Sequence, residues 1–237
     1  MISLVLMALA VAIAAFIQGA IGVGFALIVA PLAAVIRPDL LPGSLLILML
    51  PLNAYVSWRE RHHLDWRSLS RVTAGRFVGT FAGLWILLAV TGAVLNLIIG
   101  VVTILAALIT KLSPKFTPGH AAFVGAGFIT GVTETATGIG GPPLAIVYQH
   151  YPAPVLRATL AMCFLIGEIF SIVALIAKGR LGLAQIVDAA ALMLPLLAGL
   201  VASGLAHDKI SATRLRDALL IFAVLSGIVL IVQAMIA

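Results

Sequence analysis

The sequence predicts an all-α polytopic membrane protein built from two inverted repeats, each a broken or hairpin helical segment followed by three transmembrane helices. Three observations support this prediction. Of the 237 residues, 63% are hydrophobic and only 9% are charged, whereas a soluble domain has about 25% charged residues. Long apolar stretches recur from one end of the chain to the other. Two of these stretches are interrupted by glycines near their middle. We therefore expect one membrane domain with no soluble appendage.

Six apolar stretches have the length of a single membrane crossing. A spanning helix needs about 20 residues to cross the roughly 30 Å hydrocarbon core. The stretches of this length are 40–58, 70–90, 93–110, 155–177, 183–206 and 215–236. Two others, 1–36 and 119–151, are too long for one crossing, and each carries a glycine-rich interruption, QGAIGVG at 18–24 and TATGIGG at 135–141. We predict that each consists of two short helices joined by an unwound elbow.

The two interrupted stretches resemble each other in sequence. At an offset of 112 residues, glycines and prolines coincide: Gly19 with Gly131, and Pro31 with Pro143. Matches of glycine and proline are more informative than matches of Leu, Ala or Val, which are frequent in any apolar sequence. We therefore divide the membrane domain into a first repeat, 1–112, and a second repeat, 113–237.

The basic residues indicate the orientation of the chain. If each interrupted stretch folds back as a hairpin, 11 of the 14 Lys and Arg residues lie on one side, and the other side holds only Arg37, Lys178 and Arg180. If each stretch crosses once, the division is 9 against 5. Because basic residues concentrate in cytoplasmic loops, the hairpin arrangement is favoured, with both termini outside and the repeats inverted. The same rule accounts for the net charge of +6, so we expect no nucleic-acid partner.

Inverted repeats with broken helices are typical of secondary transporters, whose binding site lies near the bilayer midplane. Non-helical backbone at that depth is tolerated only where it is buried in protein or lines a water-filled cavity. The first turn of a half-helix presents unpaired N–H groups and a partial positive charge, which suit an anion. The elbows therefore predict a site for a small anion. Close helix packing by small residues is the structural alternative.

The glycine-rich stretch followed by proline, early in each half, also carries a family resemblance. The motifs are Gly19-Ala20-Ile21-Gly22-Val23-Gly24 through Pro31, and Gly138-Ile139-Gly140-Gly141-Pro142-Pro143. In these motifs, in its two-half organisation and in its size, the chain resembles the TauE/SafE family of sulfite and organosulfonate exporters. The resemblance implies a multi-pass protein of the bacterial inner (cytoplasmic) membrane that moves sulfite or small organosulfonates, usually outwards.

Ten residues are predicted to bind the substrate: Gln18, Gly19, Gly22, Gly24, Arg76, Thr130, Gly138, Gly140, Gly141 and Pro142. Gln18 and Thr130 occupy matching positions just before the paired glycines and could donate hydrogen bonds. Arg76 is the one basic residue expected inside a helix. It could meet the substrate at the cytoplasmic entrance, or its long side chain could extend to the membrane surface. The remaining polar side chains that could line a cavity are Asn53, Asn96 and Gln149.

Two acidic residues in apolar segments are candidates for ion coupling. Glu134 lies one turn before the second elbow, and Glu168 lies in the middle of 155–177. A charged residue at the bilayer centre costs roughly 2.5–3.5 kcal/mol, so both should face protein or water. A protonated Glu134 could load together with the anion, and sodium is the other candidate for the coupling ion. The structural alternative is a neutral acid hydrogen-bonded among neighbouring threonines.

Other features have simpler interpretations. Gly75, Gly79 and Gly83 lie four residues apart and predict a packing ridge. The run RERHHLDWRSLSR at 59–71 predicts a solvated cytoplasmic loop, and Tyr148 and Tyr151 predict an aromatic end at the membrane interface. With one cysteine in the chain and no further His or Cys at ligand spacing, we expect no metal site and no cofactor.

Three function classes compete with a transporter. An anion channel and a subunit of a membrane complex remain open, and an intramembrane enzyme is less favoured. Ser203 and His207 lie four residues apart and could pair as nucleophile and base, but no GxSxG-like elbow accompanies them. No P-loop is present in the sequence, so energy would come from an ion gradient or from the substrate gradient. We expect a transporter rather than an enzyme. The sequence leaves open which anion it carries and whether it forms a homo-oligomer.

Overall fold

The computed structural model describes residues 2–112, 117–149, 151–206 and 212–236, and within these ranges it is built from helices without strands. The first half contains α1 (Ile2–Ile21), α2 (Phe25–Ile36), α3 (Gly43–Arg59), α4 (Trp66–Ala89) and α5 (Gly92–Leu112). The second half contains α6 (His120–Thr137), α7 (Gly141–Tyr148), α8 (Ala153–Ala177), α9 (Leu183–Ala206) and α10 (Ala212–Ile236). Two short 3-10 helices occupy Pro38–Leu40 and Arg61–His63.

Four of the six predicted single crossings, 70–90, 93–110, 155–177 and 183–206, correspond to described helices that are long and apolar enough to cross a membrane. The helix at 40–58, α3, has 17 residues and is not among them. Five of the described helices, α1, α4, α5, α8 and α9, are long and apolar enough to cross a membrane. Both overlong stretches are divided into two helices, α1 with α2 and α6 with α7. The prediction of an all-α polytopic membrane protein is therefore confirmed.

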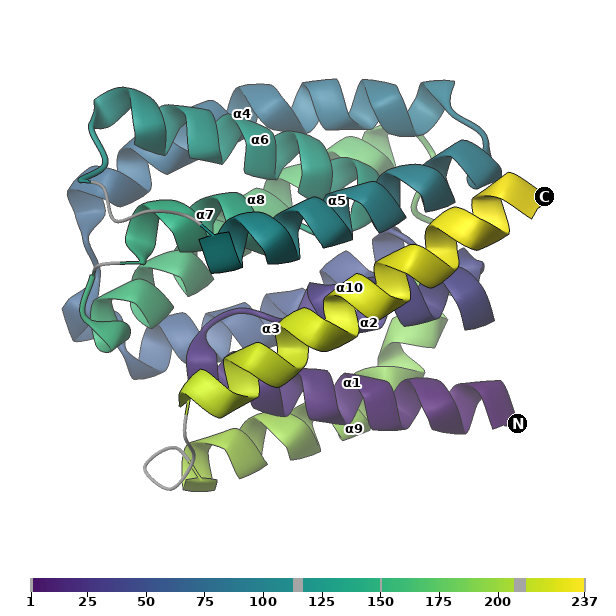
Figure 1. Cartoon of the computed structure of the whole chain (residues 1–237), viewed down its shortest axis with the longest axis horizontal. Helices are drawn as coiled ribbons and strands as arrows, with labels where there is room; N and C mark the ends of the chain where they lie inside the picture. Colours follow the sequence, from purple (N-terminus) through teal and green to yellow (C-terminus); the bar gives the residue numbers. More distant parts are fainter. Residues whose placement is uncertain (1, 113–116, 150, 207–211, 237) are drawn as a thin grey trace.

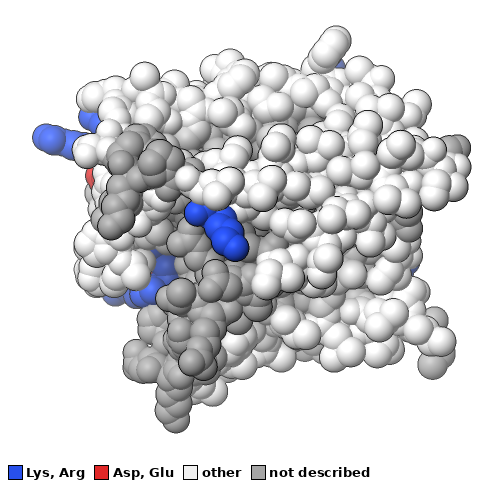
Figure 2. All heavy atoms as spheres, in the orientation of Figure 1, with Lys and Arg blue, Asp and Glu red and all other residues white. Residues whose placement is uncertain are grey.

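The helices run side by side along the longest axis of the molecule (Figure 1). The start of α1 and the end of α10 lie at one end, and the C-terminal ends of α3, α5, α7 and α9 lie at the other end, which we call the basic end. Figure 2 shows the same view with most of the surface uncharged, as a lipid-facing surface requires, and with Lys and Arg atoms mainly towards the basic end. This layout is the one expected if each interrupted stretch folds back as a hairpin. The division into inverted repeats 1–112 and 113–237 stays a prediction.

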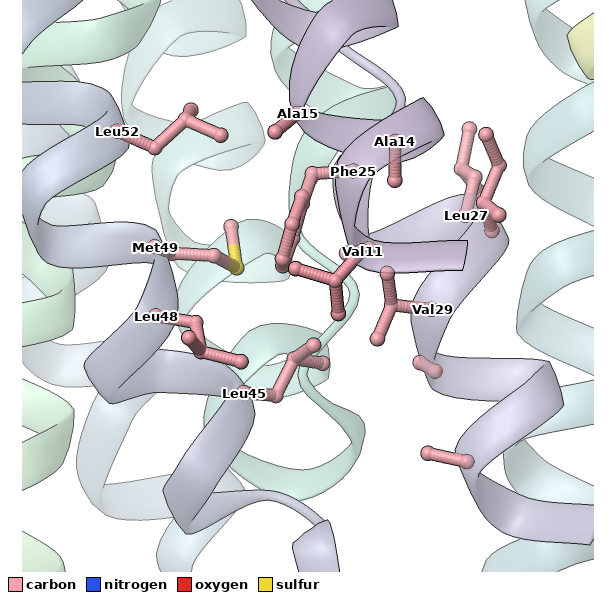
Figure 3. Close-up of a cluster of buried hydrophobic side chains, with 14 of the residues drawn as sticks. Val11, Ala14, Ala15, Phe25, Leu27, Val29, Leu45, Leu48, Met49 and Leu52 are labelled. Atoms are coloured by element: carbon pink, nitrogen blue, oxygen red, sulfur yellow. The ribbon is translucent and has the colours of Figure 1, made fainter. Parts of the chain in front are cut away.

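The interior contains two main hydrophobic cores. The first core is formed largely by α1, α2, α3 and α9, with Val11, Phe25, Met49 and Leu52 among its side chains (Figure 3). The second core is formed by α4, α6, α7 and α8 around side chains such as Phe164. Buried polar groups lie where these two packing units meet.

Glycines allow α4 and α6 to pack with their backbones in contact. A Cβ atom on Gly75 would overlap the carbonyl oxygen of Val124, and one on Gly79 would overlap that of Phe128. From the other side, a Cβ atom on Gly127 would overlap the carbonyl oxygen of Val72. The predicted packing ridge at Gly75, Gly79 and Gly83 is therefore confirmed.

An ion-pair cluster fixes the connection between α2 and α3. Arg37 Nη2 lies 2.6 Å from Asp39 Oδ2 and 3.1 Å from Asp188 Oδ1 on α9. The hydrogen bonds from Arg37 hold the pKa of the Asp39 carboxyl below its usual value. Asp188 therefore joins α9 to this connection.

Candidate anion-binding site

Each predicted elbow is a three-residue break between two helices. The first elbow is 22–24, between α1 and α2, and the second is 138–140, between α6 and α7. Gly22 has a φ of 89° and Gly138 a φ of 81°, values in the left-handed region that favours glycine. Each elbow closes on an equivalent backbone hydrogen bond, because Gly22 N donates to Gln18 O at 2.7 Å and Gly138 N donates to Glu134 O at 2.8 Å. The predicted unwound elbows are confirmed.

The elbows correspond at an offset of 116 residues, the difference between positions 22 and 138, rather than at the offset of 112 read from the sequence. The match of Gly19 with Gly131 was misleading, because both residues serve helix packing instead of the elbows. A Cβ atom on Gly19 would overlap Ser203 of α9, and one on Gly131 would approach the Thr80 nitrogen of α4 to 2.9 Å. At the corrected offset, Gln18 is equivalent to Glu134.

The two elbows come together in space, but they offer fewer backbone donors than the sequence predicts. A Cβ atom on Gly141, the first residue of α7, would lie 3.9 Å from Val23 of the first elbow. Pro142 and Pro143 have no N–H group, so Gly141 supplies the only N–H among the first three residues of α7. At the start of α2, Phe25 N already donates to Gln18 Oε1 at 2.9 Å. A charged side chain is therefore needed to attract an anion strongly.

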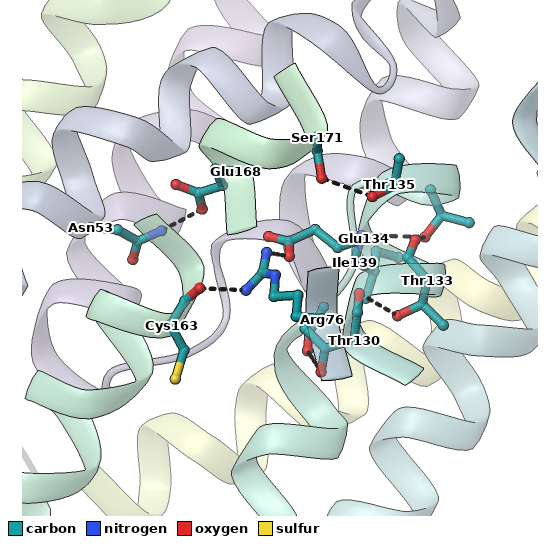
Figure 4. A network of polar contacts seen from close by, with 12 residues as sticks. Asn53, Arg76, Thr130, Thr133, Glu134, Thr135, Ile139, Cys163, Glu168 and Ser171 are labelled. Carbon is teal, nitrogen blue, oxygen red and sulfur yellow. Dashed lines mark hydrogen bonds and ion pairs between the residues drawn. The ribbon is translucent and has the colours of Figure 1, made fainter. Parts of the chain in front are cut away.

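That charge is supplied by Arg76 of α4. Its side chain is 1% exposed, so the alternative in which it extends to the membrane surface is wrong. Arg76 forms an ion pair with Glu134 and donates through Nη1 to the Cys163 carbonyl at 2.8 Å (Figure 4). Its guanidinium carbon lies 5.6 Å from the centre of the Phe164 ring. Arg76 is directed into the protein because the adjacent glycine ridge brings its backbone against α6.

Glu134 lies beside the second elbow and is 0% exposed. A Cβ atom on Gly140 would come within 2.8 Å of its carboxyl oxygen. Thr130 Oγ1 donates to the Gly140 carbonyl at 3.1 Å, so Thr130 fixes the elbow. Thr135 Oγ1 and Ser171 Oγ, 2.7 Å apart, join α6 to α8. The structure therefore brings Arg76, Glu134, Thr130 and Gly140 together around the second elbow.

Glu168 is connected to the first elbow by a chain of hydrogen bonds. Asn53 Nδ2 donates to Glu168 Oε1 at 2.6 Å, and Gln18 Nε2 donates to Asn53 Oδ1 at 2.9 Å. Gln18 in turn accepts the bond from Phe25 N. No partner of Glu168 is predicted from the sequence, although three polar residues in apolar helices indicate mutual hydrogen bonding because buried polar groups need partners.

Several predicted residues lie apart from Arg76. Gly19 and Gly22 face the basic end, where the Gly19 carbonyl accepts a hydrogen bond from Arg59 Nη2 at 2.9 Å. A Cβ atom on Gly22 would lie 2.8 Å from Arg157 Cγ. Gly24, with a φ of 128°, belongs to the backbone turn into α2.

Two further interpretations are changed by the structure. Tyr148 is 0% exposed and its hydroxyl donates to Ser68 Oγ at 2.6 Å, so its ring faces the protein interior rather than the lipid headgroups. The ring is buried because α7 packs against α5, α6 and α8 and Tyr148 belongs to the second core. Ser203 Oγ donates to the Leu200 carbonyl at 2.6 Å, and its proposed partner His207 lies outside the described residues. In the described part of the chain, no three His, Cys, Asp or Glu side chains are grouped as metal ligands.

The buried charges of the site do not balance if all of them are ionised. Arg76 carries one positive charge against two buried carboxyl groups, Glu134 and Glu168, whose side chains are both 0% exposed. Three ionised groups would leave a net charge of −1 in a medium of low dielectric constant, which is costly. An anion at Arg76 would add a further negative charge to this group.

A polytopic helical membrane protein with two broken helices and a buried ion pair beside one of them has the design of a membrane transporter. The chain matches the family model described as sulfite exporter TauE/SafE over residues 7–230, nearly its whole length. The protein belongs to the TauE/SafE sulfite exporter family, a family of membrane transporters. Searches among curated proteins and among solved structures gave no match.

Proposed function

We propose that the protein is a secondary transporter that exports sulfite or small organosulfonates, and that the anion binds near the bilayer midplane at Arg76, between the two elbows. The observation that carries this proposal is the ion pair between Arg76 and Glu134. A guanidinium is a preferred partner of oxyanions because it is always charged and presents several N–H donors. A sulfite or sulfonate group can therefore replace the Glu134 carboxylate at Arg76.

Proton uptake completes the exchange. When the anion takes the place of Glu134 at Arg76, the released carboxylate lies in a buried environment without its counter-charge. Such a carboxyl group favours its neutral, protonated form. A monoanion and a proton would then cross together without net charge. Flux should consequently depend on the pH gradient and should respond little to the membrane voltage.

The same property separates a carrier from an anion channel. A channel moves an unaccompanied charge, so its flux follows the voltage. The closed packing around Arg76, Glu134 and Glu168 favours the carrier, because a buried site must change its access to each side in turn. A role as a subunit of a larger complex predicts no flux by the purified chain alone.

The test is transport by the purified protein in liposomes. Sulfite, sulfoacetate, taurine and sulfate would be compared under imposed proton gradients, sodium gradients and potassium diffusion potentials. We expect saturable sulfite or sulfoacetate efflux that is accelerated by acid on the substrate side. Glu134→Gln should abolish the pH dependence, and Arg76→Gln should abolish saturable flux.

Arg67→Gln is the matched control, because Arg67 is an exposed arginine on the same helix. Its flux should equal that of the wild type. Normal pH-dependent flux in both Glu134→Gln and Arg76→Gln would overturn the proposed site. Voltage-driven flux without saturation would identify a channel.

A further inference from the structure

A second cluster of charged side chains lies at the basic end, away from Arg76. Arg157 Nε, near the start of α8, lies 2.7 Å from Glu60 Oε1, and Arg59 Nη2, at the end of α3, lies 3.2 Å from the same oxygen. The Glu60 and Arg157 side chains are each 10% exposed, so they are largely removed from water. We call these three residues the Arg59–Glu60–Arg157 cluster.

This cluster covers the first elbow. Arg59 Nη2 donates to the Gly19 carbonyl at 2.9 Å, and Arg157 packs so closely over Gly22 that a Cβ atom there would lie 2.8 Å from Arg157 Cγ. The carbonyl end of α1 carries a partial negative charge that favours nearby cations. The two arginines therefore close the path to the first elbow from the basic end.

The cluster also joins the two packing units. Arg59 ends α3 and Glu60 follows it, and α3 contributes to the first core, whereas Arg157 belongs to α8, which contributes to the second. The carboxyl group of Glu60 is the bridge between them. Separation of α3 from α8 at this end requires that this bridge be broken.

The charges of the cluster do not balance. Two guanidinium groups share one carboxylate, which leaves a formal excess of +1. Within the described residues, Arg59 Nη1 and Glu60 Oε2 are buried without a hydrogen-bond partner. An incoming oxyanion could bind the two arginines in place of Glu60, because carboxylate, sulfite and sulfonate oxygens have the same hydrogen-bond requirements.

The second elbow is covered in a different way. A Cβ atom on Gly138 would overlap Leu45, near the start of α3 and at the end opposite the basic one. An apolar side chain offers no binding energy to an anion. The two covers therefore differ in chemistry, one charged and one apolar.

We propose that Arg59 and Arg157 form an entry site for the anionic substrate at the cytoplasmic, basic end, which Glu60 closes and the substrate opens by displacing it. This inference rests on the proposed function, since it assumes that an anion passes the first elbow. It assigns the recognition of the anion to two arginines before Arg76. It also predicts that affinity differs between the two faces of the membrane.

The first test follows the opening of the cluster without transport. Cys163 is the only cysteine of the chain and is buried, so it reports access to the interior. A membrane-impermeant maleimide would be applied to inside-out vesicles and to intact cells. We expect Glu60→Gln to label about fivefold faster than wild type in inside-out vesicles, the factor that corresponds to about 1 kcal/mol, and at the wild-type rate in cells.

Arg157→Gln breaks the same bridge and should give the same result if Glu60→Gln fails to fold. Arg61→Gln is the control, because Arg61 is exposed and donates to the Trp58 carbonyl outside the cluster. Unchanged labelling in both cluster variants, or equal acceleration in the control, would overturn the gate.

The second test measures sulfite half-saturation from each face in oriented proteoliposomes. Arg59→Gln and Arg157→Gln should raise the half-saturating concentration at the basic end about tenfold, the effect of losing one charge-assisted hydrogen bond, and should leave the opposite face unchanged. Equal values for these variants and for Arg67→Gln would overturn the entry site. A wild type without sulfite flux would reject the proposed function, whereas the labelling result would still decide whether the cluster is a gate.

Discussion

The two elbows share backbone features but differ in the side chains beside them. Both break the helix for three residues, both place a glycine at positive φ, and both close on a hydrogen bond to the residue four positions earlier. In the first elbow that residue is Gln18, whose side-chain amide donates a hydrogen bond to Asn53 and accepts one from the backbone N–H of Phe25, the first residue of α2. In the second it is Glu134, which pairs with Arg76. The comparison indicates that the first elbow is a neutral structural turn and that the second carries the exchangeable charge.

The largest effect is expected from removing the charge at the second elbow. Arg76→Leu leaves Glu134 and Glu168 buried without a cation, and loss of one partner of a buried pair costs about 3–5 kcal/mol. The free energy of unfolding in detergent would measure this. Glu134→Leu combined with Arg76→Leu should recover most of the loss, because neither variant side chain is charged, but it should not recover sulfite flux. Equal stability of Arg76→Leu and wild type would remove the distinction between the elbows.

Making the first elbow resemble the second should have the next largest effect. Gln18→Glu places a carboxylate near Asn53 and Glu168 with no cation to balance it, at a cost of roughly 2.5–3.5 kcal/mol. Gln18→Leu is the control, since it removes the amide without adding charge and leaves Phe25 N–H unpaired at about 1–3 kcal/mol. Thermal unfolding at pH 8 and pH 5 would compare them. Only Gln18→Glu should gain stability at the lower pH, where the added carboxyl group protonates; a similar gain in Gln18→Leu would contradict the argument.

The shared backbone predicts a smaller and equal effect at both elbows. Gly22→Ala and Gly138→Ala force a side chain into the left-handed region, at about 1–2 kcal/mol each, in addition to the contacts with Arg157 and Leu45. Gly125→Ala on α6 is the control, because no atom lies within 4 Å of a Cβ there. It should stabilise the protein by about 0.5–1 kcal/mol. Chemical denaturation would rank the three variants, and a neutral Gly138→Ala would break the equivalence of the elbows.

The smallest effect is expected in the connection that follows α2, where Arg37 and Asp39 form an ion pair. Among the described residues, the connection that follows α7 has no ion pair. Arg37 lowers the pKa of Asp39 below the ordinary value of 3.8. A lowered pKa stabilises the fold above the ordinary value, and this contribution disappears as the pH falls through the lowered pKa. Asp39→Asn should therefore cost less than about 1 kcal/mol, by the same amount at every pH between 5 and 8. A cost of Asp39→Asn that changes between pH 5 and 8 would contradict the lowered pKa of Asp39.

The local backbone could be predicted from the sequence more fully than the charge pairing. Glycine near the middle of an overlong apolar stretch correctly predicted both elbows, because few other residues adopt positive φ. The offset was misjudged because Gly19 and Gly131 pack against neighbouring helices, and a packing glycine looks the same in sequence as an elbow glycine.

The partners of the buried charges depended on contacts between distant helices. Arg76 and Glu134 meet because α4 and α6 pack through glycines, and Glu168 reaches Gln18 only through Asn53 on a third helix. One signal was present: Arg76 follows Gly75 directly, so it lies at the flank of the ridge rather than on a lipid-facing side. Arg76, predicted at an entrance, lies in the interior, and the entry site that we propose instead consists of Arg59 and Arg157.

The backbone contact between α4 and α6 limits how the protein can move. Interlocked main chains leave no room for a hinge between them, since sliding one helix would drive its carbonyl oxygens into the other. Because α4 and α6 would move as one rigid unit, Arg76 and Glu134 would keep their relative positions during any conformational change. A movement of α4 relative to α6 would therefore not separate the ion pair between Arg76 and Glu134. On the proposed mechanism, only protonation of Glu134 or binding of a competing anion to Arg76 would break it.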